Sequence, residues 1–320
     1  MRGGSLTGPA SLSCVLAVRV VSVGSRSYPQ HVAACLYSPR PMYILIGRER
    51  VLSSIVFKIS VGFVAGALIL LAVSLYLSNR FLEDQLRLAE TGDLRGAMSK
   101  AEWAARLDPF SPAPLSSEGY LELRQGRPEA AANAFDRAIR RDPYNYKNHE
   151  ALANLQRQQL DDPEAAVESY REALGRNPHA ATLVSRLADA LVATGDIEGA
   201  RAQYEWLYER GRIPLRDLYT LGKVQMRLDE PEEAIETFEE ARERAEAELE
   251  SSDEQQEDQK RAFLESLDLA TADALVVQRS YAEARDYLAQ SEAEQAPAVL
   301  ALLDEDPEAY RRSVFDASIN

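Results

Sequence analysis

The sequence predicts an all-α protein, in which a helical solenoid follows one apolar N-terminal helix. Two observations lead to this fold class. A helix-turn-helix pattern recurs every 34 to 35 residues between Leu115 and Ala241, and such a period is the sequence signature of a solenoid. Upstream of it, residues 59–77 form an apolar run without a charged residue, which is long enough to cross a bilayer. No segment shows the alternating pattern of a β-strand.

The second helix of each repeat carries the clearest signature. A small residue is followed four positions later by an aromatic residue, and three positions after that by Ala or Leu. Two of the repeats add a proline five positions further on. The sets are Ala131, Phe135, Ala138 and Pro143; Ala166, Tyr170, Ala173 and Pro178; Ala200, Tyr204 and Leu207; Ala234, Phe238 and Ala241. Residues at these spacings share one helical face. We therefore expect them to form the core between stacked units, since no single unit can bury its apolar face alone.

The first helices carry a weaker signature, a leucine followed by a small residue. It occurs at Leu152-Ala153, Leu187-Ala188 and Leu221-Gly222, whereas Glu118 stands before Gly119. Together, the two signatures resemble the tetratricopeptide repeat (TPR) family over four units, roughly residues 112–246. The usual tryptophan and tyrosine of the first helix are absent. The resemblance implies a solenoid that binds proteins or peptides in a concave groove lined by the first helices.

The rest of the chain divides around these four repeats. Degenerate repeat units are expected before them, around Ala97, Ala101 and Ala104, and after them, around Ala284 and Leu288. Pro297 and Pro307 are expected to break the tail into two short capping helices. The expected segments are 1–41, a disordered tail or a stretch before a true start at Met42; 42–58, a basic juxtamembrane segment; 59–77, a transmembrane helix; 78–111, a degenerate unit; 112–246, four repeats; 247–260, an acidic linker that is a solvated loop or a frayed helix end; and 261–320, a degenerate repeat with capping helices.

The apolar run at 59–77 spans about 28 Å as a helix, close to the thickness of the hydrocarbon core. Its alternative is a buried core helix, but a run this long that is apolar on all faces favours a single transmembrane span. The helical pattern continues beyond it to a point near Gly92. Gly62 and Gly66 place two small residues on one face. They are candidates for self-association of the span, although glycine is common in membrane helices anyway.

The flanking charges predict the orientation of the span. Arg48, Arg50 and Lys58 precede the run, while Arg80 and Arg87 follow it. Because basic residues stay on the cytoplasmic side, this bias of three against two favours a single-pass cell-membrane protein with its repeats outside the cytoplasm.

The charge distribution excludes some classes of function. The net charge is −15, yet residues 1–82 hold eight basic residues and only one acidic residue, Glu49. The repeat region is therefore strongly acidic and repels phosphates, so general nucleic-acid binding is not expected. Both cysteines, Cys14 and Cys35, precede the repeats.

A search for catalytic or metal-binding patterns gives no candidate. The three histidines, His31, His149 and His179, have no partner at metal-ligand spacing. Acidic pairs such as Asp161-Asp162 are typical of solvated helix surfaces. We therefore expect neither enzymatic activity nor a cofactor or metal.

The resemblance to TPR proteins also implies candidate groove residues on the first helices. They are Tyr120, Arg124, Lys147, Asn154, Arg157, Tyr219, Lys223 and Arg227. Basic residues dominate this set inside an acidic domain, which favours an acidic peptide or a free carboxy terminus as the ligand. The alternative is that these bases only balance neighbouring acids.

The sequence therefore predicts a membrane-anchored TPR scaffold for protein–protein interaction, with a chaperone-like or assembly role for envelope proteins. Two alternatives remain. The chain is either a structural component of a homo-oligomeric membrane complex, or a regulator of a partner enzyme on the cytoplasmic side.

Overall fold

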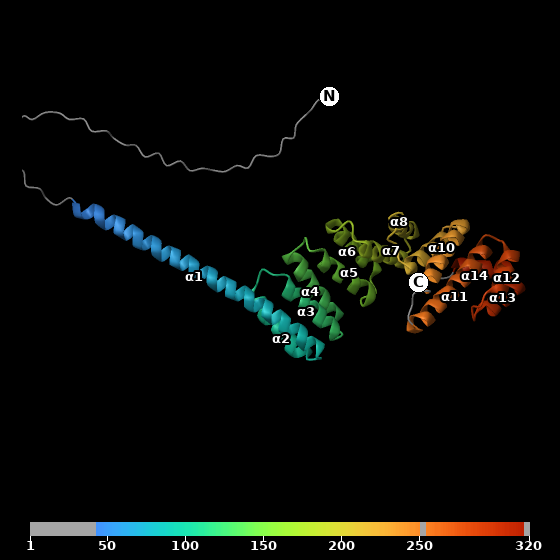
Figure 1. Ribbon diagram of the computed structural model, residues 1–320, viewed down its shortest axis with the longest axis horizontal. Helices are drawn as coiled ribbons and strands as arrows, with labels where there is room; N and C mark the ends of the chain where they lie inside the picture. Colours follow the sequence, from blue (N-terminus) through green and yellow to red (C-terminus); the bar gives the residue numbers. More distant parts are fainter. Residues whose placement is uncertain (1–42, 250–253, 317–320) are drawn as a thin grey trace, which may run out of the picture. The chain divides into compact units, whose positions relative to one another are not determined.

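The structure, a computed structural model, describes the backbone of residues 43–249 and 254–316 and the side chains of 56–247 and 258–315. All regular elements in these ranges are α-helices (Figure 1). Contacts divide the described chain into two units, with the boundary inside α1 between Phe63 and Val64. The segment expected as a tail, 1–41, lies outside the described residues. The helices are α1 Tyr43–Glu90, α2 Leu94–Leu107, α3 Ala113–Arg124, α4 Pro128–Arg141, α5 Tyr146–Gln158, α6 Pro163–Arg176, α7 Ala181–Thr194, α8 Ile197–Tyr208, α9 Leu215–Arg227, α10 Pro231–Leu249, α11 Glu254–Val277, α12 Tyr281–Gln290, α13 Ala296–Glu305 and α14 Pro307–Asp316.

Helix α1 contains a segment long and apolar enough to cross a membrane. That segment is Val56–Glu90; its most apolar window has a mean hydropathy of 2.4, and none of that window is buried. Phe63 and Leu70 are 78% and 73% exposed. A core helix of this chain would bury such side chains, so exposure on this scale favours the membrane span over a core helix. Nothing lies within 4 Å of a Cβ atom built on Gly62 or Gly66.

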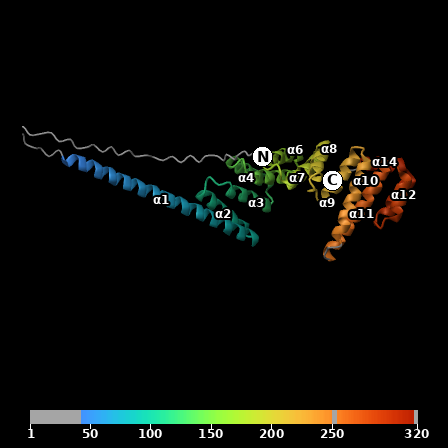
Figure 2. The same ribbon diagram turned by 45° about the horizontal axis from the view of Figure 1, so that its top comes forward.

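The last part of α1 serves as the first helix of the first hairpin. Helix α2 runs back along it, as both views show (Figure 1 and Figure 2). The Ser74 hydroxyl donates a hydrogen bond to the Leu107 carbonyl (2.6 Å), and the Ser78 hydroxyl donates one to the Ala104 carbonyl (3.0 Å). The helix therefore continues from the apolar run into the degenerate repeat without a break.

The four central repeats are the hairpins α3–α4, α5–α6, α7–α8 and α9–α10, each packed against its neighbours in sequence. In the turn of each hairpin, the residue at the same position has a left-handed backbone conformation, with a positive φ angle. It is glycine at Gly92, Gly126 and Gly195, where the absence of Cβ makes this conformation easy; the other turns use Asp161, Asp229 and Arg279. In several repeats, an aspartate just before the second helix caps it. Its carboxylate accepts a hydrogen bond from the backbone N–H three residues later, as Asp196 accepts from the N–H of Gly199.

The predicted core residues of the second helices are buried. Apart from the exposed prolines Pro143 and Pro178, the twelve residues of the four signatures have 0% exposure, which confirms the core prediction for them: Ala131, Phe135, Ala138, Ala166, Tyr170, Ala173, Ala200, Tyr204, Leu207, Ala234, Phe238 and Ala241. In two of the repeats, the small residue of the first helix faces the aromatic ring. Where the aromatic residue is Phe135 or Phe238, the facing residue is Gly119 or Gly222.

We expect Gly119→Ala and Gly222→Ala to destabilise the fold. Alanine normally stabilises a helix interior by about 1 kcal/mol over glycine. A Cβ atom at Gly119, however, would lie 2.7 Å from Cε1 of the buried Phe135 ring, and overpacking of this kind costs about 1–3 kcal/mol. Gly175→Ala is the matched control, because its Cβ meets nothing within 4 Å; it should stabilise the chain. Urea denaturation midpoints should fall for Gly119→Ala and Gly222→Ala and rise for Gly175→Ala. A change in the same direction for all three variants would contradict this packing.

The C-terminal region differs in part from the expected layout. The acidic segment 247–260 was expected as a loop or a frayed helix end, but α10 extends to Leu249 and α11 already begins at Glu254. Glutamate, glutamine and lysine are good helix formers, and this stretch lacks Gly and Pro, which explains the helix. Beyond it, α13 and α14 start around Pro297 and Pro307. They share a second core cluster with α11 and α12 that includes Val276, Leu288 and Leu303.

Candidate functional site

The first helices of the four central repeats lie side by side and form what we call the first-helix layer: α3, α5, α7 and α9. Side-chain contacts connect each helix to the next. The Ser116 hydroxyl of α3 donates to Oδ1 of Asn148 on α5 (2.7 Å). Arg186 of α7 pairs with Glu150 of α5, and Arg216 of α9 pairs with Asp189 of α7 (2.8 Å). This layer carries all eight predicted groove residues.

Every carboxylate of the first-helix layer is paired with an arginine. The five acidic residues and their partners are Glu118 with Arg137, Glu122 with Arg127, Glu150 with Arg186, and Asp189 and Asp217 with Arg216. Seven basic residues lie on the same four helices, and only Arg186 and Arg216 belong to these pairs. The other five are the basic residues predicted from the sequence. The acids of this layer are therefore balanced without them.

The α3 end of the layer is open to solvent. Tyr120 is 53% exposed and packs edge-on against Phe135, with ring centroids 5.1 Å apart. Burial of part of the side chain, together with the nearby Glu150 carboxylate, raises the pKa of Tyr120. Arg124 and Lys147 are exposed. Within the described residues, neither of these two side chains forms an ion pair with an acidic group.

Asn154 and Arg157 have a role in the core that the sequence did not indicate. The buried Tyr170 hydroxyl donates to Oδ1 of Asn154 (2.6 Å). Burial raises the pKa of Tyr170, and the adjacent Arg157 guanidinium opposes that rise. The carbonyl side of Asn154 is thus used internally, which leaves its NH₂ group for a ligand. Nε of Arg157 is buried without a hydrogen-bond acceptor among the described residues.

A sequence signal for this contact exists in the residue that follows the small residue of each first helix. In the two repeats with a tyrosine signature, that residue is Asn154 or Asp189. Each accepts the tyrosine hydroxyl, with Tyr204 donating to Asp189 at 2.7 Å. In the two repeats with phenylalanine, which has no hydroxyl to satisfy, the same place holds Tyr120 or Lys223.

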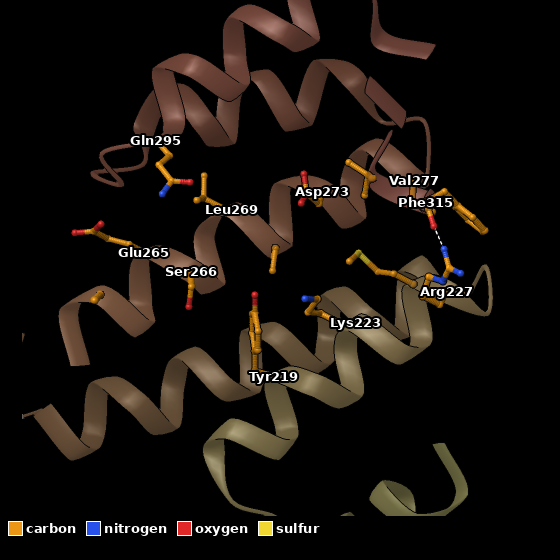
Figure 3. Close-up of a pocket in the computed structure, with 14 residues that line it drawn as sticks. Tyr219, Lys223, Arg227, Glu265, Ser266, Leu269, Asp273, Val277, Gln295 and Phe315 are labelled. Atoms are coloured by element: carbon orange, nitrogen blue, oxygen red, sulfur yellow. Dashed lines mark hydrogen bonds between the residues drawn. The ribbon is translucent and has the colours of Figure 1, made fainter. Parts of the chain in front are cut away.

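The remaining three predicted residues lie at the α9 end, where they share one pocket. Tyr219, Lys223 and Arg227 point from α9 toward α11 and α14 (Figure 3). The pocket has a volume of about 440 Å³. Its other lining residues are Met226, Ala262, Glu265, Ser266, Leu269, Ala270, Asp273, Val277, Gln295, Val314 and Phe315. Tyr120, Arg124, Lys147, Asn154 and Arg157 do not line it.

Two polar contacts hold this pocket together. Arg227 donates a hydrogen bond to the Phe315 carbonyl, shown as the dashed line in Figure 3. The Tyr310 hydroxyl of α14 donates to Oδ1 of Asp273 on α11 (2.7 Å). Burial raises the pKa of Asp273 to about 6, against the opposing effects of Tyr310 and Lys223. Burial also lowers the pKa of Lys223, and Asp273 opposes that change. The C-terminal helix thus covers one end of the layer.

Neither the described histidines nor the acidic residues form a metal site. Nε2 of His149 lies 3.3 Å from the Pro143 carbonyl in a buried position, a structural role within the repeat. Across residues 43–249 and 254–316, no three His, Cys, Asp or Glu side chains are grouped so that they could hold a metal ion. His31 lies outside the described residues.

Comparison with known protein families decides the identity of the repeats. A sequence profile described as tetratricopeptide repeat matches residues 86–146, 116–181 and 185–248, which together cover half of the chain; a second tetratricopeptide repeat profile matches 158–205. The chain belongs to the tetratricopeptide repeat family. As a TPR protein it is a helical scaffold for protein–protein interaction, as the resemblance in its sequence implied. The first profile match begins at residue 86, within the last turns of α1.

Several solved structures contain similar repeats. A MamA protein is 19% identical, with 53% of this chain and 92% of that chain aligned and a TM-score of 0.48. MamA from Desulfovibrio magneticus RS-1 is 17% identical, with coverages of 52% and 93% and a TM-score of 0.47. YrrB, described as a TPR protein with an unusual peptide-binding site, is 18% identical, with coverages of 50% and 82% and a TM-score of 0.44. No curated protein sequence matches the chain.

Proposed function

We propose that this chain is a membrane-anchored TPR scaffold that binds an acidic segment of a partner protein along the first-helix layer. One observation carries the proposal: every carboxylate of the layer is paired with an arginine, while Arg124, Lys147, Arg157 and Arg227 stay outside those pairs. An acidic ligand meets a surface whose own acids are already neutralised. Charge-assisted hydrogen bonds to its carboxylates then supply affinity.

The two ends of the layer would contribute different contacts to such a ligand. At the α3 end, Arg124, Lys147 and the Tyr120 ring are exposed, so this end offers charge and an apolar ledge. At the α9 end, the pocket combines Lys223 with apolar side chains such as Met226 and Leu269. That combination suits a ligand in which an acidic residue is next to an apolar residue. Because Arg227 is bonded to Phe315, a ligand that engages it must replace this contact.

The anchor of the proposed scaffold is the apolar part of α1. Its exposed apolar surface supports a single membrane span, and the flanking charge bias favours repeats outside the cytoplasm. On that side, a chaperone-like or assembly role for envelope proteins fits an interaction scaffold. Gly62 and Gly66 have open space around them, so a second copy of the span could approach there. A homo-oligomer is therefore the second candidate.

We expect Arg124→Glu combined with Lys147→Glu to weaken binding of acidic peptides by about tenfold, because each reversal turns one exposed attraction into a repulsion worth a few tenths to 1 kcal/mol. The measurement is fluorescence anisotropy of labelled peptides with the full chain in detergent. Binding of the unaltered chain should also weaken as salt is added.

The matched control is Arg140→Glu combined with Arg141→Glu. These residues are exposed on α4, a second helix outside the layer, so the control changes the net charge of the chain equally. It should leave peptide affinity nearly unchanged. The proposal fails if both double variants lose binding alike, or if the preferred peptides are apolar or basic and indifferent to salt.

A further inference from the structure

Helix α2 ends level with the apolar run of α1 rather than beyond it. The Leu107 carbonyl, at the C-terminal end of α2, accepts the hydrogen bond from Ser74. Ser74 lies three residues inside the run that ends at Leu77, which is about 4–5 Å along the helix axis. The turn that follows α2 is therefore attached to α1 beside the last turn of its apolar segment.

This turn presents an exposed aromatic side chain on a backbone that is held by hydrogen bonds. Oδ1 of Asp108 accepts hydrogen bonds from the backbone N–H groups of Phe110 (3.3 Å) and Ser111 (3.2 Å). Phe110 is 83% exposed. Two more aromatic side chains are exposed on the neighbouring helices: Tyr76 of α1 at 65% and Trp103 of α2 at 49%.

Exposure alone does not distinguish this turn, because the next repeat contains the same structure. There, Oδ1 of Asp142 accepts from the Tyr144 N–H (3.2 Å), and Tyr144 is also 83% exposed. A single exposed aromatic side chain on a soluble surface is ordinary. The difference lies in the attachment to the apolar run, which the turn at Phe110 has and the turn at Tyr144 lacks.

The length of the apolar run determines what surrounds Phe110. If the hydrocarbon ended below the turn, at Val73, then Ile59–Val73 would span only about 22 Å, against a core of about 30 Å. Sliding the span toward its amino end would draw Lys58 toward hydrocarbon, which is unfavourable for a charged side chain. Keeping the whole run to Leu77 in apolar surroundings brings the turn to the boundary of the bilayer. Aromatic rings are favoured there.

We propose that the Phe110 turn is a membrane-contact site: Phe110 inserts at the boundary between lipid headgroups and acyl chains. The first repeat is thereby seated on the bilayer surface. This inference rests on the membrane anchor of the proposed function. It adds a second point of attachment, through which the orientation of the first hairpin relative to the membrane is held.

Tryptophan fluorescence with brominated lipids tests the contact directly. Trp103 and Trp206 are the two tryptophans of the chain, so Trp103→Phe with Trp206→Phe gives a silent background. Phe110→Trp or Tyr144→Trp is added to this background, and each full chain is reconstituted into phosphatidylcholine vesicles with or without bromine near the acyl–headgroup boundary. The two probes occupy the same turn in successive repeats.

We expect bromine to reduce emission from the tryptophan at position 110 by about twofold, because an interfacial ring lies within contact range of the acyl chains. Emission from position 144 should be unchanged. Alkaline carbonate extraction and vesicle flotation, done on the same samples, report the anchor separately. Chains that resist extraction but show no quenching at 110 would overturn the membrane contact and leave the anchor standing. Equal quenching at positions 110 and 144 would overturn the proposal that the membrane contact is specific to the Phe110 turn. Chains released by carbonate would overturn the anchor and the contact together.

Discussion

Phe238→Ala is expected to lower the free energy of unfolding by about 3–5 kcal/mol, the usual cost of removing a large side chain from a core. Phe238 has 0% exposure, and its ring packs against Gly222. The centroids of the Phe238 and Tyr219 rings are 5.8 Å apart. Because glycine faces the ring, no side chain on that side can extend to fill the space left behind. Phe135→Ala should behave in the same way, since Gly119 faces its ring.

Two controls separate core loss from the loss of any aromatic ring. Tyr144 is 83% exposed, so Tyr144→Ala should stay within about 0.5 kcal/mol of the unaltered chain. Phe315, partly buried near the C-terminus, should give an intermediate loss. The measurement is chemical denaturation followed by circular dichroism. If the four variants behaved alike, the core assignment of the second helices would be contradicted.

The parts of the fold that the sequence predicted are those set by local spacing. Ala234, Phe238 and Ala241 could be placed in the core because one helical face and the neighbouring unit are enough to bury them. The start of α14 at Pro307 follows from proline chemistry in the same way. The acidic stretch before α11 was harder to interpret, because its charged residues suit both a solvated loop and an exposed helix.

The candidate site was predictable only to the extent that it depends on helix faces. The eight groove residues were chosen from their places on the first helices, and the structure puts them on the layer those helices form. The contact of Tyr170 with Asn154 depends on the approach of two helices, and the approach of Phe315 to Arg227 joins residues 88 positions apart. Neither contact has a periodic signal. Asp273 was missed for the same reason, because it becomes part of the pocket only when α14 packs against α11.

Asp273 makes the stability of the C-terminal region depend on pH. It accepts a hydrogen bond from Tyr310 of α14, and it faces Lys223 and Tyr219 of α9 across the pocket. Burial raises the pKa of Asp273 to about 6, compared with about 4 for an aspartate in an unfolded chain. The folded state therefore binds its proton more tightly than the unfolded state does. The contribution of this group to stability is complete below about pH 4 and is lost as the pH rises through 6.

We therefore expect Asp273→Asn to stabilise the chain at neutral pH and to lose that advantage in acid. A shift of about two pKa units corresponds to at most about 3 kcal/mol, and asparagine can still accept the Tyr310 hydrogen bond without ionising. The measurement compares urea midpoints of the variant and the unaltered chain from pH 4.5 to 7.5, a range that brackets the pKa of about 6. The effects of the other carboxylates cancel, because both chains contain them. Asp268, also on α11, pairs instead with Arg242 and accepts from the Ser291 hydroxyl at 2.7 Å. Asp268→Asn breaks an ion pair and should destabilise the chain at neutral pH, the opposite sign. A difference for Asp273→Asn that stayed constant across the pH range would show that burial in the pocket does not raise the pKa of this carboxylate.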